Sequence, residues 1–135
     1  MIGCGVSVSS SEAVFVWVDL PSGVLLQQAK AKVQLNDPYM QGDVAQTFDV
    51  IRQLLAERKT GMVAVKKSST SGKFPASHVA FRLEALIALA SPVEVRFVSP
   101  QAIAAFVKTE QPEIPGALLK YQTDAYVALM AVVGK

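Results

Sequence analysis

The stretch Gly-Met-Val-Ala-Val-Lys-Lys-Ser-Ser-Thr-Ser-Gly-Lys, residues 61–73, decides the fold and the candidate site of this 135-residue chain. Its apolar run at 62–65 has the composition of a buried strand and stops at two lysines, Lys66 and Lys67. Small hydroxyl residues follow, then a glycine and Lys73, before a helix is expected to begin. A buried strand that ends in a basic loop rich in backbone N–H groups is a suitable place to bind an anion.

The segments on either side predict a run of strands followed by alternating helices and strands. Two β-rich runs separated by a polar turn at 9–12 predict a hairpin. Alternating apolar and polar residues predict a third strand, with Lys30 and Lys32 on its solvated face. Apolar residues at helical spacing follow Asp43 and Ser77, both suitable N-caps. The expected elements are strands at 2–8, 13–20 and 24–35, a helix at 43–58, a strand at 62–66, a helix at 77–90, a strand at 93–98, and helices at 101–108 and 117–133.

The composition indicates one folded domain over residues 1–135. Hydrophobic residues make up 51% and charged residues 18%, which argues against extensive disorder. The longest apolar runs, 13–18 and 125–133, are shorter than the roughly 20 residues of a membrane-spanning helix, and no basic segment marks a signal peptide. We therefore expect a cytoplasmic protein without a membrane partner. The net charge of +2 is weak support for a polyanionic partner, and the large apolar share is compatible with a homodimer.

The cysteine, the histidine, Glu84 and most aromatic residues are interpreted as structural rather than catalytic residues. Cys4, the only cysteine, is expected to be a small buried hydrophobe, and neither it nor His78, the only histidine, can build a typical zinc site. Glu84 is interpreted as a surface charge. Tyr39 lies in a predicted loop and is the one aromatic residue left free to stack on a ligand. The aromatic residues expected in the core are Phe15, Trp17, Phe48, Phe81 and Phe97.

The order of elements and three local motifs resemble the RNase H-like fold, and within it the RuvC-type resolvases. The motifs are Gly-Cys-Gly-Val-Ser at 3–7, Val-Ser-Pro-Gln at 98–101, where the Ser-Pro pair suits a helix start, and Thr-Asp-Ala-Tyr-Val-Ala-Leu at 123–129. The resemblance covers nearly the whole chain. It implies an α/β fold with a five-stranded mixed sheet, its first three strands antiparallel, and helices on both faces. The chain also resembles a small uncharacterised bacterial family, a domain of unknown function, with this fold.

The same resemblance identifies where this chain departs from a nuclease. The family holds two divalent metal ions with converging carboxylates. Ser7 stands at the place of the aspartate on the first strand, and Lys66 or Lys67 at the place of the glutamate after the fourth strand. Asp124 is the acid that remains. One carboxylate cannot build a two-metal site and a lysine repels the ions, so we expect no metal, no cofactor and no metal-dependent cleavage.

The residues proposed from sequence to contact phosphate cluster around the basic loop. They are Lys66, Lys67, Ser69, Thr70, Gly72, Lys73 and Arg82. The segment does not match a nucleotide P-loop, because no glycine stands at the required distance before Gly72 and Phe74 follows Lys73. The alternative interpretation is a solvated loop of small polar residues. If the fold is RNase H-like, Ser7, Lys66 and Asp124 are neighbours, either as a cleft that accepts phosphate or as a simple Lys66–Asp124 ion pair.

Three functional hypotheses follow. The leading one is a non-catalytic RNase H-like domain that binds DNA or RNA weakly through the phosphate backbone. The second is a protein-interaction or dimerisation module without a nucleic-acid ligand. The third is a metal-dependent nuclease that uses a different set of acids, Glu12, Asp19 and Asp124.

Overall fold

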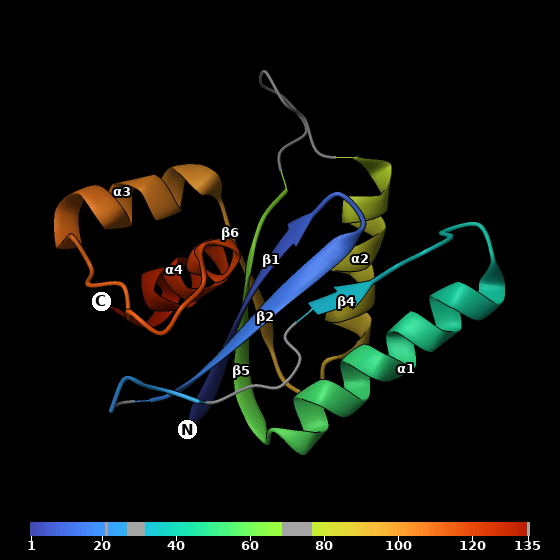
Figure 1. Cartoon of the computed structure of the whole chain (residues 1–135), viewed down its shortest axis with the longest axis horizontal. Coiled ribbons are helices and arrows are strands. Elements are labelled where there is room, and N and C mark those ends of the chain that lie inside the picture. Colours follow the sequence, from blue (N-terminus) through green and yellow to red (C-terminus); the bar gives the residue numbers. More distant parts are fainter. Residues whose placement is uncertain (21, 27–31, 69–76, 135) are drawn as a thin grey trace.

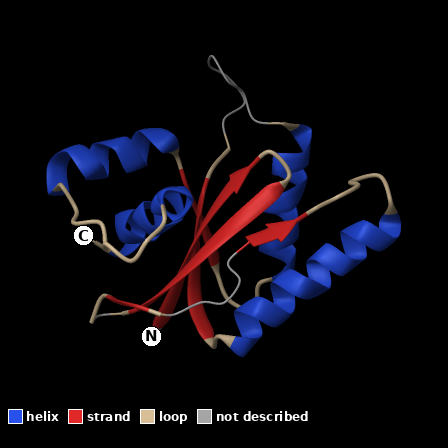
Figure 2. Ribbon diagram, in the orientation of Figure 1, coloured by secondary structure: helices blue, strands red, loops and turns tan. Residues whose placement is uncertain are grey.

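A mixed β-sheet lies between two layers of helices in the computed structural model, which describes residues 1–20, 22–26, 32–68 and 77–134 (Figures 1 and 2). The strands are β1 (Ile2–Ser9), β2 (Glu12–Asp19), β3 (Val24–Leu25), β4 (Lys32–Gln34), β5 (Thr60–Lys66) and β6 (Val95–Val98). The helices are α1 (Gln41–Glu57), α2 (His78–Ala90), α3 (Pro100–Glu110), the short 3-10 helix η1 (Lys120–Gln122) and α4 (Thr123–Val133).

The sheet order is β3-β2-β1-β5-β6, and β4 also pairs with β2. The strands β1, β3 and β4 run antiparallel to β2, whereas β1–β5 and β5–β6 are parallel pairs. Parallel pairs need crossover connections. In the chain, α1 lies between β4 and β5, and α2 connects β5 to β6. The expected α/β architecture is therefore confirmed, with antiparallel strands first and alternating helices and strands afterwards.

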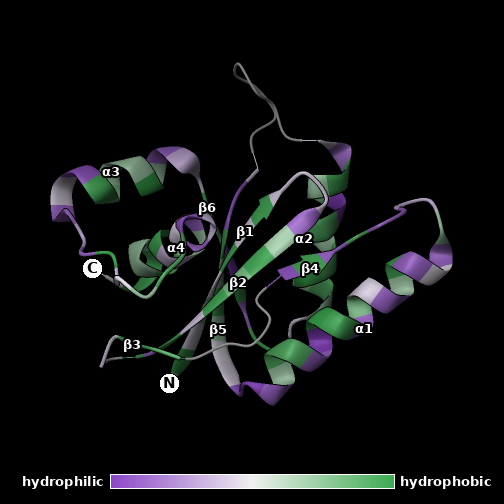
Figure 3. Ribbon diagram, in the orientation of Figure 1, coloured by the Kyte–Doolittle hydropathy of each residue, from purple (hydrophilic) through white to green (hydrophobic). Residues whose placement is uncertain are grey.

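The alternation of side chains along β1 divides the core between the two faces of the sheet. Cys4 and Val6 are fully buried on the side of α1 and α2, among Phe15 and Trp17. The other face packs against α4, whose Ala125 and other apolar residues meet the valines of β2. The colouring of β2 in Figure 3 fits burial on both faces, because the strand is hydrophobic along its middle and polar at its ends.

Gly5 allows α4 to lie directly on β1. A Cβ atom at this position would overlap the backbone carbonyl oxygen of Ala125, and a Cβ atom at Gly3 would come within 3.0 Å of the Leu129 side chain. Only glycine therefore permits this close approach of a helix backbone to the strand. The approach fixes the first turn of α4 against the sheet.

Among the first three helices, two starts match the sequence prediction and one does not. Ser77 caps α2, with its Oγ accepting from the N–H of Ala80 at 3.2 Å. Ser99 caps α3 in the same way, with Pro100 in the first turn. The helix expected from residue 43 begins two residues earlier, after Met40, which makes no side-chain cap, so that Asp43 lies in the first turn instead.

The structure corrects three further predictions. The strand expected over 24–35 is present as the short strands β3 and β4, and residues 27–31 lie outside the described part. The last helix begins at Thr123 rather than 117, so that Tyr121, inside the expected range, lies in η1 and is 42% exposed. Phe97 was expected in the core but is also 42% exposed, because it lies on β6 at the edge of the sheet.

The predictions for Cys4 and for three of the other aromatic residues are confirmed. Phe15 and Trp17 are fully buried and stack with ring centroids 5.8 Å apart, and the half-buried Phe48 packs against the same core. Phe81 is half-buried and belongs to neither core cluster, so its expected core position is not confirmed. Cys4 is fully buried, and this burial raises the pKa of its thiol far above the ordinary value. In the part of the chain that the structure describes, no helix has the length and hydrophobicity to cross a membrane.

The close approach at Gly5 predicts a large loss of stability from the smallest possible side chain. We expect Gly5→Ala to lower the free energy of unfolding by about 2–3 kcal/mol, because α4 must shift away from β1. Urea denaturation followed by the fluorescence of Trp17 measures this.

The matched control is Gly42→Ala in the first turn of α1, where an added Cβ meets nothing within 4 Å. That change is expected to leave stability unchanged or to raise it by up to about 1 kcal/mol, because alanine favours helix. Equal effects of the two substitutions would contradict the proposed close approach.

Candidate nucleic-acid interface

A row of neighbouring residues crosses four strands on the face of the sheet that carries α4. Lys66 on β5 is the register partner of Ser7 on β1, Ser7 is opposite Val14 on β2, and Val14 is opposite Lys32 on β4. Partners across a sheet project to the same face, and Val14 belongs to the core beneath α4. With strands about 4.8 Å apart, the Cα atoms of Lys32 and Lys66 are roughly 14 Å apart.

Asp124 completes the arrangement from the first turn of α4. Its Oδ2 lies 3.1 Å from the Nζ of Lys66, and the two side chains are 61% and 31% exposed, respectively. The neighbouring residue Ala125 is the one whose carbonyl lies over Gly5, so the close packing of α4 on β1 also places Asp124. A carboxylate in the first turn of a helix is further stabilised by the helix dipole. Ser7, Lys66 and Asp124 are thus brought together as expected.

Lys32 and Tyr121 extend this site, and the sequence did not identify either. The Nζ of Lys32 lies 4.0 Å from the centre of the Tyr121 ring and 3.9 Å from a carboxylate oxygen of Glu12. Strand alternation had correctly placed Lys32 on the outer face, but it could not show that η1 passes over that face. An ammonium group over an exposed tyrosine ring gains about 0.5–1 kcal/mol.

The loop after β5 is anchored where it begins. The N–H of Lys67 donates to the carbonyl oxygen of Val98 at 2.8 Å, and the N–H of Ser68 donates to Oε2 of Glu84 at 2.7 Å. Glu84 is therefore half-buried and holds the strand end, rather than being a free surface charge as expected. The side chain of Lys67 is left exposed. The other loop residues proposed to contact phosphate, Ser69, Thr70, Gly72 and Lys73, lie outside the described residues.

Arg82 does not extend the basic edge formed by Lys66 and Lys67. It lies on α2, on the opposite side of the sheet from α4, with its guanidinium carbon 4.8 Å from the centre of the Tyr39 ring. Tyr39 also has His78 beside it, with ring centroids 6.0 Å apart. The tyrosine that was expected to be free to stack therefore has two protein neighbours.

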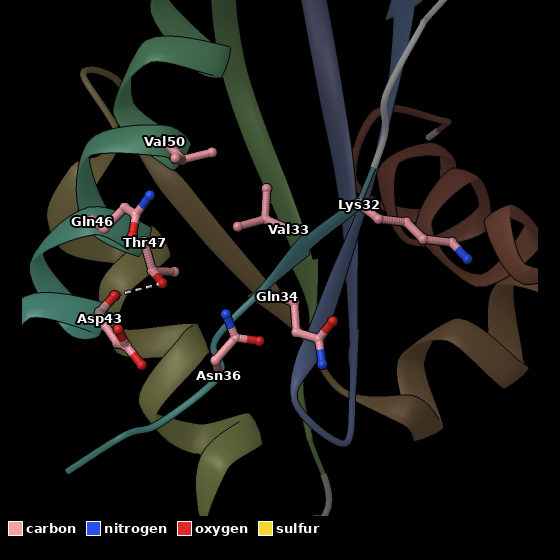
Figure 4. Close-up of a pocket in the computed structure, with 8 residues that line it drawn as sticks. All are labelled: Lys32, Val33, Gln34, Asn36, Asp43, Gln46, Thr47 and Val50. Carbon is pink, nitrogen blue, oxygen red and sulfur yellow. Dashed lines mark hydrogen bonds between the residues drawn. The ribbon is translucent and has the colours of Figure 1, made fainter. Parts of the chain in front are cut away.

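A polar pocket of about 220 Å³ lies between β4 and α1 (Figure 4). Its wall includes the carboxamides of Gln34, Asn36 and Gln46 and the carboxylate of Asp43. The hydroxyl of Thr47 donates to the backbone oxygen of Asp43 at 2.8 Å. Figure 4 shows that the Lys32 side chain leads away from these groups, toward the side of the sheet where α4 lies. The pocket therefore adjoins the lysine row at Lys32, which lines it, while the Lys32 ammonium lies on the other side.

The carboxylates proposed for a nuclease with a different set of acids do not converge. Glu12 and Asp19 lie at opposite ends of β2, and seven residues of strand span roughly 23 Å. Within the described ranges, no group of three or more His, Cys, Asp or Glu residues is placed to hold a metal ion. Where Ser7, Lys66 and Asp124 meet, the possible donors are one carboxylate and a serine hydroxyl beside a lysine ammonium. These residues do not fit the two divalent ions of the RNase H-like nucleases.

Comparison with known proteins agrees with this architecture. The chain belongs to the family described as "Protein of unknown function (DUF3010)", whose model matches residues 1–132. No curated protein matches the chain. The expected membership of an uncharacterised family is therefore confirmed.

Solved structures show the RNase H-like, RuvC-type fold. A Thermus thermophilus RuvC in complex with Holliday junction substrate is similar with a TM-score of 0.68 at 14% identity, over 97% of this chain and 91% of that one. A second Thermus thermophilus RuvC structure gives a TM-score of 0.63 at 12% identity, over 97% and 92%. The inorganic polyphosphate/ATP-glucomannokinase of Arthrobacter sp. strain KM gives 0.51 at 17% identity, covering 86% of this chain and 51% of that one.

The exposure of the Lys66–Asp124 pair predicts a small energetic coupling. In a double-mutant cycle of Lys66→Met and Asp124→Asn, we expect a coupling free energy below about 1 kcal/mol, because water screens both groups. Urea denaturation of the four proteins measures it. A coupling of about 3 kcal/mol or more would instead indicate a pair that the fold requires.

Proposed function

We propose that this chain is a non-catalytic RNase H-like domain that binds nucleic acid through the phosphate backbone, at the edge formed by Lys66 and Lys67. The observation that carries the proposal is the Lys66 ammonium 3.1 Å from Asp124. Lys66 stands at the position where the resolvases, by resemblance, are expected to have a metal-binding acid. A positively charged side chain at this position attracts phosphate without requiring a metal ion.

The charges around this edge favour binding that is weak and depends on salt. Lys66 shares its charge with Asp124, whereas Lys67 is exposed and has no carboxylate partner among the described residues. Lys32 adds a further positive charge, partly offset by Glu12 at 3.9 Å. The proposal also includes Ser69, Thr70, Gly72 and Lys73, on the evidence of sequence alone. Contacts of this kind release counterions and lose affinity steeply as salt rises.

The fold gives independent support for a nucleic-acid ligand. The RuvC structure that is similar over 97% of this chain was determined with a Holliday junction substrate. At 14% identity this likeness concerns the fold, so the ligand class is part of our proposal. The absence of catalysis is proposed from the donor groups present, since a single acid beside a lysine cannot hold two metal ions and activate a water molecule.

A protein-interaction module is the second candidate, and one feature favours it. A largely apolar cavity of about 340 Å³ lies between α3 and α4, lined in part by Ala105, Phe106 and Ala131. On the same side of the sheet, Val107 of α3 is 41% exposed, and none of the α3 residues is fully buried. Sedimentation velocity over a concentration series distinguishes the two candidates. Self-association that is lost in Phe106→Ala, together with no binding to oligonucleotides, would favour the interaction module.

Two variants with opposite expected effects on oligonucleotide binding test the main proposal. We expect Lys66→Met with Lys67→Met to weaken the binding of a single-stranded oligonucleotide and to lower the salt slope of log K by about 1.4, for two lost phosphate contacts. Asp124→Asn is expected to strengthen binding, because it removes a negative charge and frees Lys66. Fluorescence anisotropy over a salt series measures both effects.

The matched control is Lys59→Met with Lys108→Met, which removes the same charge from the other end of β5 and from α3. Binding that falls equally in the control would show a diffuse charge effect and contradict the assigned edge. Cleavage of DNA or RNA in magnesium that is lost in Asp124→Asn would contradict the non-catalytic assignment.

A further inference from the structure

The ring of Tyr39 is held at the surface without being buried. The residue is 72% exposed, although the Arg82 guanidinium lies 4.8 Å from the ring centre and His78 lies beside it at 6.0 Å. Exposed aromatic residues are common singly, but this one is flanked by two other planar side chains that can stack. Most of its ring surface is still available to a ligand.

The loop before α1 fixes the position of this ring. The N–H of Tyr39 donates to Oδ1 of Asp37 at 2.9 Å, and the N–H of Met40 donates to the backbone oxygen of Asp37 at 3.2 Å. These two bonds form a turn that leads directly into α1. The Asp37 carboxylate offsets part of the positive charge that Arg82 brings to this place, and it does not oppose a neutral aromatic ring.

A cavity on this side of the molecule is lined by Arg82 and by Pro38, the residue before Tyr39. It has a volume of about 220 Å³ and lies between α1 and α2, and the Arg82 that lines it also has its guanidinium carbon 4.8 Å from the centre of the Tyr39 ring. Its other walls are apolar: Leu35, Pro38, Val44, Ala85 and Leu86. Apolar walls with one guanidinium plane suit a flat, weakly polar ring better than a charged group.

We propose that Tyr39, Arg82 and this cavity form a subsite for a nucleobase of a single-stranded nucleic acid. The inference rests on the proposed function and names the part of the ligand that this side of the molecule contacts. Bases stack on tyrosine rings and on arginine planes irrespective of their sequence. The bases of an intact duplex are already stacked on each other, so the subsite selects single strands or unpaired ends.

The subsite lies at the same end of the molecule as the basic edge. Ser77, which begins α2 beside His78, donates from its Oγ to the backbone oxygen of Ser10 at 3.1 Å. Ser10 belongs to the turn after β1, the strand in which Ser7 is paired with Lys66. Figure 1 shows the end of β5, the β1–β2 turn and the start of α2 at one end of the sheet. One strand of nucleic acid can therefore contact both places.

The experiment compares a thymidine oligonucleotide with an abasic oligonucleotide of equal length by fluorescence anisotropy. We expect Tyr39→Ala to weaken binding of the thymidine oligonucleotide by about tenfold and to leave binding of the abasic one unchanged. Tyr39→Phe should bind as the wild type does, because the ring is retained. Arg82→Ala should weaken binding of the thymidine oligonucleotide more than Arg52→Ala, which removes the same charge from the surface of α1.

Two results would overturn the inference while leaving the proposed function intact. The first is unchanged binding of both oligonucleotides by Tyr39→Ala; the second is an equal loss for both. Leu89→Ala, which trims a side chain on α2 that is 73% exposed, controls for general surface effects.

If the wild-type protein binds neither oligonucleotide at low salt, the proposed function fails and the subsite is tested separately with free adenosine. His78 is the only histidine in the chain, so its ring protons give an unambiguous NMR signal next to Tyr39. A ring-current shift on titration with adenosine that is absent in Tyr39→Ala would support the subsite, and no shift would overturn it.

Discussion

The contact between α4 and β1 at Gly5 determines the geometry of the rest of the site. Because a Cβ atom there would overlap the carbonyl oxygen of Ala125, the helix backbone rests on the strand itself rather than on a layer of side chains. Asp124, one residue earlier, is thereby brought 3.1 Å from Lys66, which is the register partner of Ser7. Because Gly5 has no Cβ atom, residues of β1, β5 and α4 that are far apart in the sequence can meet here.

In the function that we propose, the ion pair at this meeting point attracts phosphate without the metal ions that cleavage requires. A divalent metal needs several oxygen ligands and then polarises both phosphate and water. A lysine ammonium needs none of these ligands and supplies one positive charge with three donors. Since the Lys66–Asp124 pair is partly exposed, it contributes little to stability, and its groups can exchange partners at low cost when an anion approaches.

Sequence patterns correctly predicted the positions of residues that follow from the order of the strands. They failed for residues whose surroundings depend on which other elements pack against their strand. The convergence of Ser7, Lys66 and Asp124 followed from the resemblance to a known topology, and the serine caps followed from local hydrogen-bonding chemistry. Phe97 was misplaced because a hydrophobic strand at a sheet edge has the same composition as a central one. The contact of Lys32 with Tyr121 was missed because it depends on the path of η1, which carries no periodic signal.

The two faces of the sheet have different chemistry at this end, and in the function that we propose this difference orients a bound strand of nucleic acid. The α4 face presents ammonium groups, Lys66 and Lys32, which suit the phosphate backbone. The α2 side presents the planar groups of Tyr39 and Arg82, with the charge of Arg82 partly offset by Asp37, and such planar groups suit bases. The turn at Ser10 lies between them, tied to α2 by Ser77. In the function that we propose, a single strand lying along this turn has its phosphates toward α4 and its bases toward α2, so the two faces determine which side of the strand meets each of them.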